Sequence, residues 1–188
     1  MPGSTAHQLH TIEDYVRLEG FSNVKHEFLD GQVYAMGGGT PAHGTYAANL
    51  IRVLGNHVKN LPCRVQTSDV RVRVAATGLD TYPDISVVCG HLEVDKEDPF
   101  AIINPVLLVE VLSPSTEAYD RGKKLEHYKL IPSLTEVVFV AHDRQHVEVV
   151  RRDGDQWHQS GASSGEAIGL ESVGLQLHVD DVYHDPLG

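Results

Sequence analysis

The sequence predicts a mixed α/β (α+β) fold, in which a mixed central sheet is flanked by helices. Apolar residues recur first with helical and then with strand periodicity, in the order helix, hairpin, helix, strands, helix, strands. No clear linker interrupts the 188 residues, and a hydrophobic fraction of 41% is enough to fill a core. We therefore expect a flexible N-terminus over residues 1–10 and a single domain over residues 11–188.

The N-terminal part predicts a short helix followed by a hairpin. Residues 11–19 carry apolar residues at near-helical spacing, with Thr11 as the N-cap. Residues 25–36 predict the hairpin, because Asp30-Gly31 is a strong two-residue turn signal between two β-forming runs. Glu27 lies on the first strand of this hairpin.

A glycine-rich loop, Gly37-Gly38-Gly39, precedes a second amphipathic helix over residues 43–59. No Gly-Lys-Ser/Thr follows the glycines, so the loop is not a P-loop and a plain connector is favoured. His43 stands at the start of the helix, where a histidine can approach a phosphate or a metal-bound water. A lone histidine is nevertheless more often part of polar packing.

The middle of the chain is rich in β-forming residues. Residues 63–74 contain valines that alternate with Arg71 and Arg73, which predicts a half-exposed strand with a basic outer face. Asp84 begins an apolar run that predicts another strand. The acidic residues 91–99 predict a solvated surface loop.

The strongest functional candidate lies within residues 104–128. Glu110 interrupts an apolar strand, and a carboxylate there is costly to bury unless a metal ion, a basic partner or several donors bind it. A half-solvated or arginine-paired glutamate at a strand end is the alternative. In the following helix, Asp120, Lys124 and Tyr128 are four residues apart and therefore share a face, whereas Lys123 points elsewhere.

The C-terminal third predicts strands at residues 135–141 and 146–151, and one or two short strands with a docked segment within residues 166–183. Residues 161–165 match Gly-x-Ser-x-Gly. Their polar and small flanks do not suit a nucleophile elbow, so we expect a loop there.

Charge and composition limit the class of protein. The net charge of −11 argues against nucleic-acid binding through a broad basic surface and is compatible with carboxylates that hold a divalent cation. No apolar run approaches the roughly 20 residues of a membrane span, and no secretory signal is apparent, so we expect a cytoplasmic protein without a membrane partner. Cys63 and Cys89 lack metal-ligand spacing, and two buried free thiols in a reducing cytoplasm are expected.

Three carboxylates, Glu27, Asp84 and Glu110, fall at or in apolar strands. Two or three carboxylates that converge at strand ends make a hard oxygen site for Mg²⁺ or Mn²⁺. Such a metal polarises a phosphoryl oxygen and lowers the pKa of a bound water. Lys124 beside it can orient or help deprotonate that water, or neutralise charge in the transition state. The set predicts metal-assisted hydrolysis of a phosphodiester.

Pro83-Asp84 at a strand start, a second acidic residue in a later apolar strand and a nearby lysine resemble the PD-(D/E)xK nuclease signature. The chain also resembles the Uma2 family, which is described as restriction-endonuclease-like, from about residue 11 to residue 183. The runs that carry this second resemblance are HEFLDG (26–31), His43, YPDISVV (82–88), LLVEVLSPST (107–116) and DRGKKLEHY (120–128).

The resemblance implies a restriction-endonuclease-like core with Asp84 and Glu110 as metal ligands and Glu27 as a further acidic member of the site. Where the nuclease signature has a lysine two residues after the glutamate, this chain has Leu112. The catalytic lysine would then be Lys124, which matches the helix lysine of the family. The resemblance also assigns supporting positions on the same helix, at Asp120 and Tyr128, and leaves Lys123 as a less favoured substitute.

The leading hypothesis is a Mg²⁺- or Mn²⁺-dependent endonuclease that acts on DNA as a homodimer. Because the chain is acidic, most phosphate contacts would come from four cations, namely Arg71, Arg73, Lys123 and Lys124. Two alternatives stay open. One is a catalytically inactive binding or assembly module with a nuclease fold, and the other is a hydrolase of a different phosphoester, such as RNA or a nucleotide.

Overall fold

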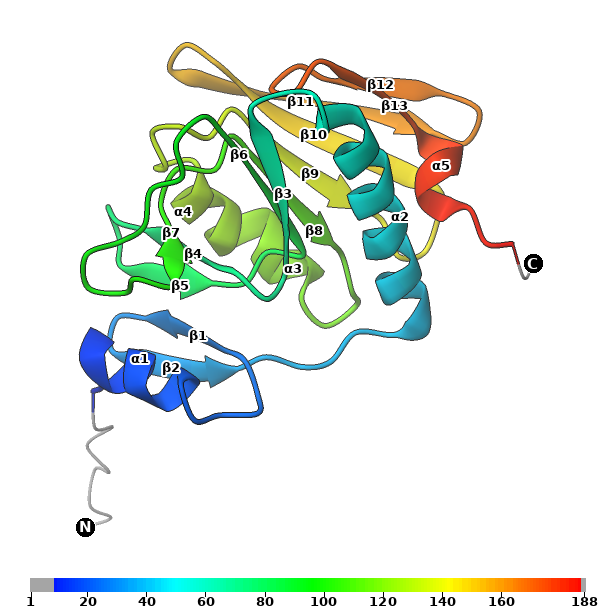
Figure 1. Cartoon of the computed structure of the whole chain (residues 1–188). Helices are drawn as coiled ribbons and strands as arrows, with labels where there is room; N and C mark the ends of the chain where they lie inside the picture. Colours follow the sequence, from blue (N-terminus) through cyan, green and yellow to red (C-terminus); the bar gives the residue numbers. More distant parts are fainter. Residues whose placement is uncertain (1–8, 187–188) are drawn as a thin grey trace.

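The computed structural model describes residues 9–186, which form three sheets with helices packed against them (Figure 1). The helices are α1 (Ile12–Glu19), α2 (Pro41–Val58), α3 (Glu117–Tyr119), the π-helix η1 (Asp120–Lys124), α4 (Leu125–Tyr128) and α5 (Val179–Tyr183). The strands are β1 (His26–Leu29), β2 (Gln32–Ala35), β3 (Cys63–Thr67), β4 (Arg71–Val74), β5 (Leu79–Thr81), β6 (Ile85–Cys89), β7 (Ala101–Ile102), β8 (Leu107–Val111), β9 (Glu136–Val140), β10 (His146–Asp153), β11 (Gln156–Ser163), β12 (Ala167–Leu170) and β13 (Leu175–His178).

A six-stranded mixed sheet forms the centre of the molecule. Its strand order is β11-β10-β9-β8-β6-β3, in which β8 and β9 run parallel and the other neighbours antiparallel. Successive residues enter two separate apolar cores, because Val109 packs with residues of α2 on one face and Leu108 with residues of α4 on the other. Burial of both faces explains the continuous apolar runs of β8 and β9. The predicted fold class, mixed sheets flanked by helices, is confirmed.

A second sheet, in the order β2-β1-β5-β4-β7, includes the N-terminal hairpin. α1 packs on this hairpin, where the ring of buried Tyr15 stacks on that of Phe28 with centroids 5.1 Å apart. Thr11 caps α1 in a reciprocal capping box with Asp14. The predicted N-terminal helix and the hairpin with its Asp30-Gly31 turn are therefore confirmed.

The basic outer face predicted for residues 63–74 is wrong. The segment forms two strands, β3 and β4, that belong to different sheets. Arg71 and Arg73 in β4 are buried and ion-paired, Arg71 with Asp98 at 2.6 Å. Asp98 is itself fully buried, although it lies in the segment predicted as a solvated loop. The reason is that the chain after residue 91 folds back and pairs β7 alongside β4, which brings carboxylates onto the arginines.

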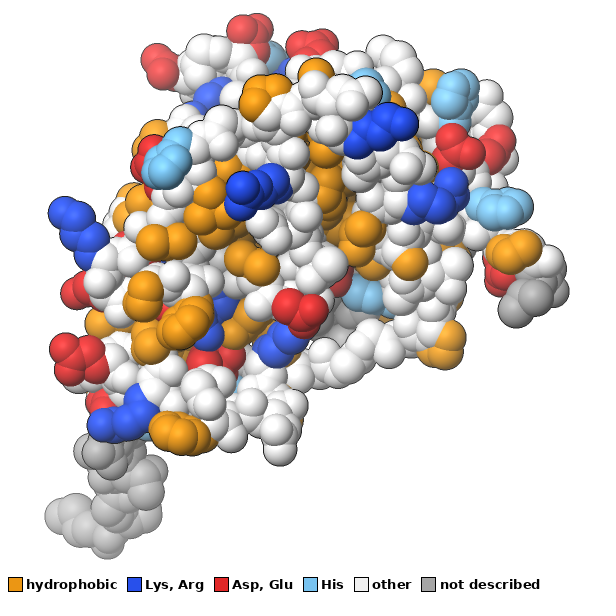
Figure 2. Space-filling view, viewed as in Figure 1, with side chains coloured by type: hydrophobic (Ala, Val, Ile, Leu, Met, Phe, Trp, Pro, Cys, Tyr) orange, Lys and Arg blue, Asp and Glu red, His pale blue; other side chains and the backbone are white. Residues whose placement is uncertain are grey.

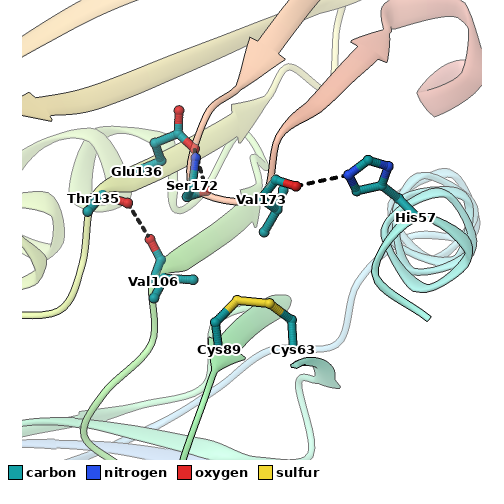
Figure 3. The surroundings of a disulfide bond; sticks show 8 residues. All are labelled: His57, Cys63, Cys89, Val106, Thr135, Glu136, Ser172 and Val173. Carbon is teal, nitrogen blue, oxygen red and sulfur yellow. Dashed lines mark hydrogen bonds between the residues drawn. A yellow bond between two sulfur atoms is a disulfide. The ribbon is translucent and has the colours of Figure 1, made fainter. Parts of the chain in front are cut away.

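Cys63 and Cys89 form a disulfide, so the expected pair of free thiols is wrong (Figure 3). The antiparallel register of β3 and β6 sets the two cysteines directly opposite each other, although 26 positions separate them in the sequence. Such a register between distant strands is not visible in cysteine spacing. The bond ties the edge strand β3 to β6, and β6 follows directly on Asp84.

Two further predictions concern residues 161–165 and the N-terminus. Gly161, Ala162 and Ser163 belong to the strand β11 and not to a loop, and no nucleophile elbow is formed by this β-hairpin strand. Residues 1–8, most of the predicted flexible N-terminus, lie outside the described residues, and the boundary at residue 11 stays a prediction. Within residues 9–186, none of the helices has the length and apolar character that a membrane crossing requires.

Candidate active site

Asp84 and Glu110 are neighbours because of the pairing between β6 and β8. The antiparallel register sets Ile85 opposite Val109, and one further step sets Asp84 opposite Glu110. Opposed residues of an antiparallel pair project to the same face of the sheet. The backbone N–H of Val111 donates to Oδ2 of Asp84 at 2.7 Å, which holds this carboxylate against the end of β8.

Lys124 reaches the same place from the helical segment after β8. Its ammonium lies 3.0 Å from Oε1 of Glu110, 3.2 Å from Glu27 and 3.4 Å from Asp120. The helical segment is kinked within residues 120–124, where the backbone of Gly122 is non-helical, and the side chains of Asp120 and Lys124 on either side of it are buried. Lys123 in the same segment is exposed, as its position in the predicted helix indicates.

Two neutral side chains complete the hydrogen bonding of these carboxylates. The Tyr128 hydroxyl donates to Oε1 of Glu110 at 2.6 Å, and the Thr81 hydroxyl donates to Oε1 of Glu27. Both close contacts of Glu110, from Tyr128 and Lys124, fall on the same oxygen, Oε1. Neither contact uses the second oxygen of Glu110, and Glu110 lines the neighbouring cleft.

The cluster carries more negative than positive charge in a buried setting. Glu110 and Lys124 are only 4% and 3% exposed. Burial raises the pKa of Glu110 to about 8, with Lys124 opposing the shift and Asp120 adding to it. Burial alone would lower the pKa of Lys124, but the surrounding carboxylates, Glu110 first, raise it well above its usual value. The carboxylates thus favour the charged form of Lys124, while burial makes the charged form of Glu110 costly and favours the arrival of a further cation.

His43 also contacts Asp84, with Nε2 at 3.2 Å from Oδ2 of that carboxylate. This hydrogen bond raises the pKa of His43 against the opposing effect of burial. Its place follows from α2, which begins at Pro41 with Thr40 as N-cap, two residues earlier than predicted. A Cβ on Gly39 would lie 2.7 Å from Nδ1 of His43, so a glycine is needed there for the imidazole to occupy this position.

These residues line a cleft of about 720 Å³. One wall is formed by the N-terminal hairpin and the glycine-rich loop, with Tyr34 and Met36 among its residues. The opposite wall is formed by the turn between β8 and α3 and by Tyr119, whose phenol pKa is raised by burial. Asp84, Glu110 and Lys124 all line the cleft, so a phosphate group that entered it would meet them.

The donor set fits a divalent cation. Across residues 9–186, no group of three or more His, Cys, Asp or Glu side chains is arranged to hold a metal ion. Mg²⁺, however, commonly takes one or two carboxylates and completes its coordination with waters and substrate phosphate oxygens. Asp84 and Glu110 supply that number of hard donors beside a cleft, and a cation would offset the surplus negative charge. They are the residues that would hold Mg²⁺ or Mn²⁺.

Similarity to known proteins identifies the family of the chain. The family model of Uma2, described as "Putative restriction endonuclease", matches residues 12–180. The chain belongs to the Uma2 family. An uncharacterized protein of Synechocystis sp. is 36% identical to this Uma2 chain over 172 residues, which cover 91% of the chain and 90% of that relative. A second uncharacterized Synechocystis protein is 29% identical over 148 residues, which cover 78% of the chain and 84% of that relative.

A solved structure from Anabaena variabilis, described as a "putative nuclease belonging to DUF820", has the same fold as this Uma2 chain. The TM-score is 0.75, and the match covers 92% of the chain and 97% of the solved one. The sequence identity is 19%, so this likeness shows the fold alone.

The structure brings together every residue that the sequence singled out for the site, namely Glu27, Asp84, Glu110, Lys124, Asp120, Tyr128 and His43. Sequence reasoning missed Thr81, Tyr119 and Tyr34. Tyr34 carries a usable signal, because counting outward from the Asp30-Gly31 turn pairs it with Glu27, and the register confirms this pairing. Thr81 and Tyr119 carry none, since their contacts depend on how the two sheets meet.

Proposed function

We propose that this Uma2 protein is an endonuclease that hydrolyses phosphodiester bonds of DNA with the help of Mg²⁺ or Mn²⁺. The observation that carries the proposal is the buried pair of Glu110 and Lys124, with Asp84 opposite Glu110 at the edge of a cleft. Two further observations support the same reaction class. The chain belongs to a family described as "Putative restriction endonuclease", and its fold is nuclease-like.

Asp84 and Glu110 would hold the metal, which supplies polarisation of a phosphoryl oxygen and activation of a water. Lys124 does not take a proton from that water, because its raised pKa keeps it charged and three carboxylates surround its ammonium. Its role is to keep Glu110 in place and to offset negative charge near the scissile phosphate.

The remaining residues position these groups. Tyr128 fixes one oxygen of Glu110, and Asp120 and Glu27 fix the ammonium of Lys124. His43 contacts Oδ2 of Asp84, the same oxygen that accepts from the Val111 amide. Arg71 and Arg73 are engaged in buried ion pairs, so they are not the phosphate contacts that the sequence suggested.

A cleavage assay tests the proposal. Purified protein with Mg²⁺ or Mn²⁺ should cut DNA, and Glu110→Ala should abolish the activity. Glu126→Ala is the matched control, because Glu126 is an exposed carboxylate on α4 that pairs with Lys129 at the surface. Absence of cleavage by the wild type with either metal, or equal activity of Glu110→Ala and the control, contradicts the proposal.

An inactive binding or assembly module is the second candidate, and the burial of Arg71 and Arg73 favours it because these two cations are not available to DNA phosphates. Calorimetric titration with Mn²⁺ separates the two candidates. Metal binding that Asp84→Asn removes supports the nuclease, and no binding supports the module.

A homodimer and a cytoplasmic location are also part of the proposal. Light scattering after size-exclusion chromatography measures the molar mass in solution and so tests the homodimer. The Cys63–Cys89 disulfide weighs against the second, because disulfides are rare in reducing compartments. Thiol labelling of protein taken directly from cells decides it, since two labelled cysteines indicate the reducing compartment.

A further inference from the structure

Tyr34 is an exposed aromatic residue next to the buried carboxylates. It lies on β2 directly opposite Glu27 on β1, so both side chains project from the same face of the hairpin. Glu27 is buried against Lys124, whereas Tyr34 is 55% exposed and lines the cleft. The exposed ring can therefore contact a ligand in the cleft.

The cleft offers little positive charge for phosphates. Lys25 and Lys124 are the cations among its lining residues within residues 9–186, and both are already ion-paired, Lys25 with Asp69 at 2.8 Å. Figure 2 shows Lys and Arg side chains standing singly over this face of the molecule, without a continuous basic patch. Duplex DNA is bound chiefly through its phosphates, and the lining of this cleft offers little of that source of affinity.

The shape of the cleft also selects against a closed duplex. Its volume of about 720 Å³ is that of a pocket for a small ligand, which corresponds to a nucleotide or two and is far less than a turn of double helix. The reacting groups Glu110 and Lys124 are almost completely buried within it. A single strand, whose backbone and bases can enter the cleft one nucleotide at a time, fits these dimensions better than a duplex.

We propose that the substrate of this site is a single-stranded polynucleotide, and that Tyr34 stacks on a base beside the scissile phosphate. The inference rests on the proposed nuclease function and specifies its substrate. Aromatic side chains bind single strands by stacking on bases, a contact that tolerates any sequence and needs no basic surface. Val24 and Met36 line the same wall and extend the apolar surface next to the ring.

Cleavage of three forms of one labelled oligonucleotide tests the inference: single-stranded DNA, single-stranded RNA and blunt duplex DNA, each with Mn²⁺. At least one single strand should be cleaved much faster than the duplex. Tyr34→Ala should lower kcat/KM on that strand by about 5- to 150-fold, the usual effect of losing one stacked base. Tyr34→Phe keeps the ring and should retain most of the activity.

Phe100→Ala is the control, because Phe100 is another exposed aromatic residue but does not line the cleft. Thermal melting of each variant verifies that it is folded, as expected for changes at exposed positions. Faster cleavage of the duplex, or equal activity of Tyr34→Ala and Phe100→Ala, overturns the inference.

A binding measurement separates this inference from the proposed function. Fluorescence anisotropy of the same strands is measured with Glu110→Gln protein, in which catalysis is removed and Tyr34 is intact. Tighter binding of a single strand than of the duplex, lost on adding Tyr34→Ala, supports the inference even if the wild type cleaves nothing and the nuclease proposal fails. Equal binding of single strand and duplex, or no effect of Tyr34→Ala, overturns it.

Discussion

The ammonium of Lys124 lies 3.0 Å from Oε1 of Glu110, and both groups are almost completely removed from water. Glu27 and Asp120 approach the same ammonium, so one cation serves three carboxylates. A buried arrangement with surplus negative charge is expensive in isolation and becomes favourable when a second cation joins it. The pair therefore links the stability of the fold to the proposed metal chemistry.

Replacing Lys124 by methionine should destabilise the protein by about 3–5 kcal/mol, the usual cost of leaving buried carboxylates, here Glu27 and Asp120 besides Glu110, without their cation. Urea denaturation without metal measures the change. Lys123→Met is the matched control, and it should alter the free energy of unfolding by less than about 0.5 kcal/mol because Lys123 is exposed. Equal effects of the two substitutions would show that the Lys124 cluster contributes nothing to folding.

The raised pKa of Glu110 predicts a pH dependence of stability. The folded protein binds a proton at Glu110 up to about pH 8, whereas an unfolded glutamate releases it near its ordinary value of 4.5. Between these values the folded state holds more protons, so the free energy of unfolding should fall as pH rises, by at most about 1.4 kcal/mol per pH unit for this proton. His43, whose pKa is also raised, contributes in the same direction just above its ordinary value of 6.5.

Comparing the wild type with Glu110→Gln gives the contribution of the Glu110 carboxylate to the pH dependence, because the amide does not titrate. Metal-free Glu110→Gln should show a flatter decline of stability from pH 5 to pH 8 than the wild type, while His43→Gln keeps the Glu110 contribution. Affinity for Mn²⁺ should rise over the same interval in the wild type, since the metal competes with the proton. Identical pH profiles of the wild type and Glu110→Gln would contradict the raised pKa.

The Cys63–Cys89 disulfide predicts a redox-dependent stability. Closing a segment of this length should contribute about 3.5 kcal/mol by restricting the unfolded chain. Urea denaturation with and without dithiothreitol should differ by that amount for the wild type. The double variant Cys63→Ala/Cys89→Ala should be insensitive to the reductant. Wild-type stability that does not respond to full reduction would rule out a structural contribution of the bond.

Local patterns predicted the parts of the fold that depend on neighbours in sequence. The Asp30-Gly31 dipeptide predicted the hairpin turn. The four-residue spacing predicted that Asp120, Lys124 and Tyr128 lie on one side of the helical segment. Leu112 occupies the position at which the nuclease signature has its lysine, and the Leu112 side chain is buried in the apolar core with Tyr128. The lysine of the site therefore comes from the helical segment.

Contacts between distant strands were beyond sequence reasoning. The alternation of valines with Arg71 and Arg73 correctly indicated two different faces, but not that carboxylates such as Asp98 would cover the basic one. The disulfide likewise depends on the register of β3 on β6. Both errors have the same physical origin, since long-range pairing decides burial and proximity.

The central claim is that Asp84 and Glu110 together hold a divalent metal beside Lys124. Crystals soaked in Mn²⁺ and measured at an anomalous wavelength test it most directly. We expect an anomalous peak that touches carboxylate oxygens of both Asp84 and Glu110, absent from crystals of Asp84→Asn. No peak in this cleft, or a peak that persists unchanged in Asp84→Asn, would contradict the account.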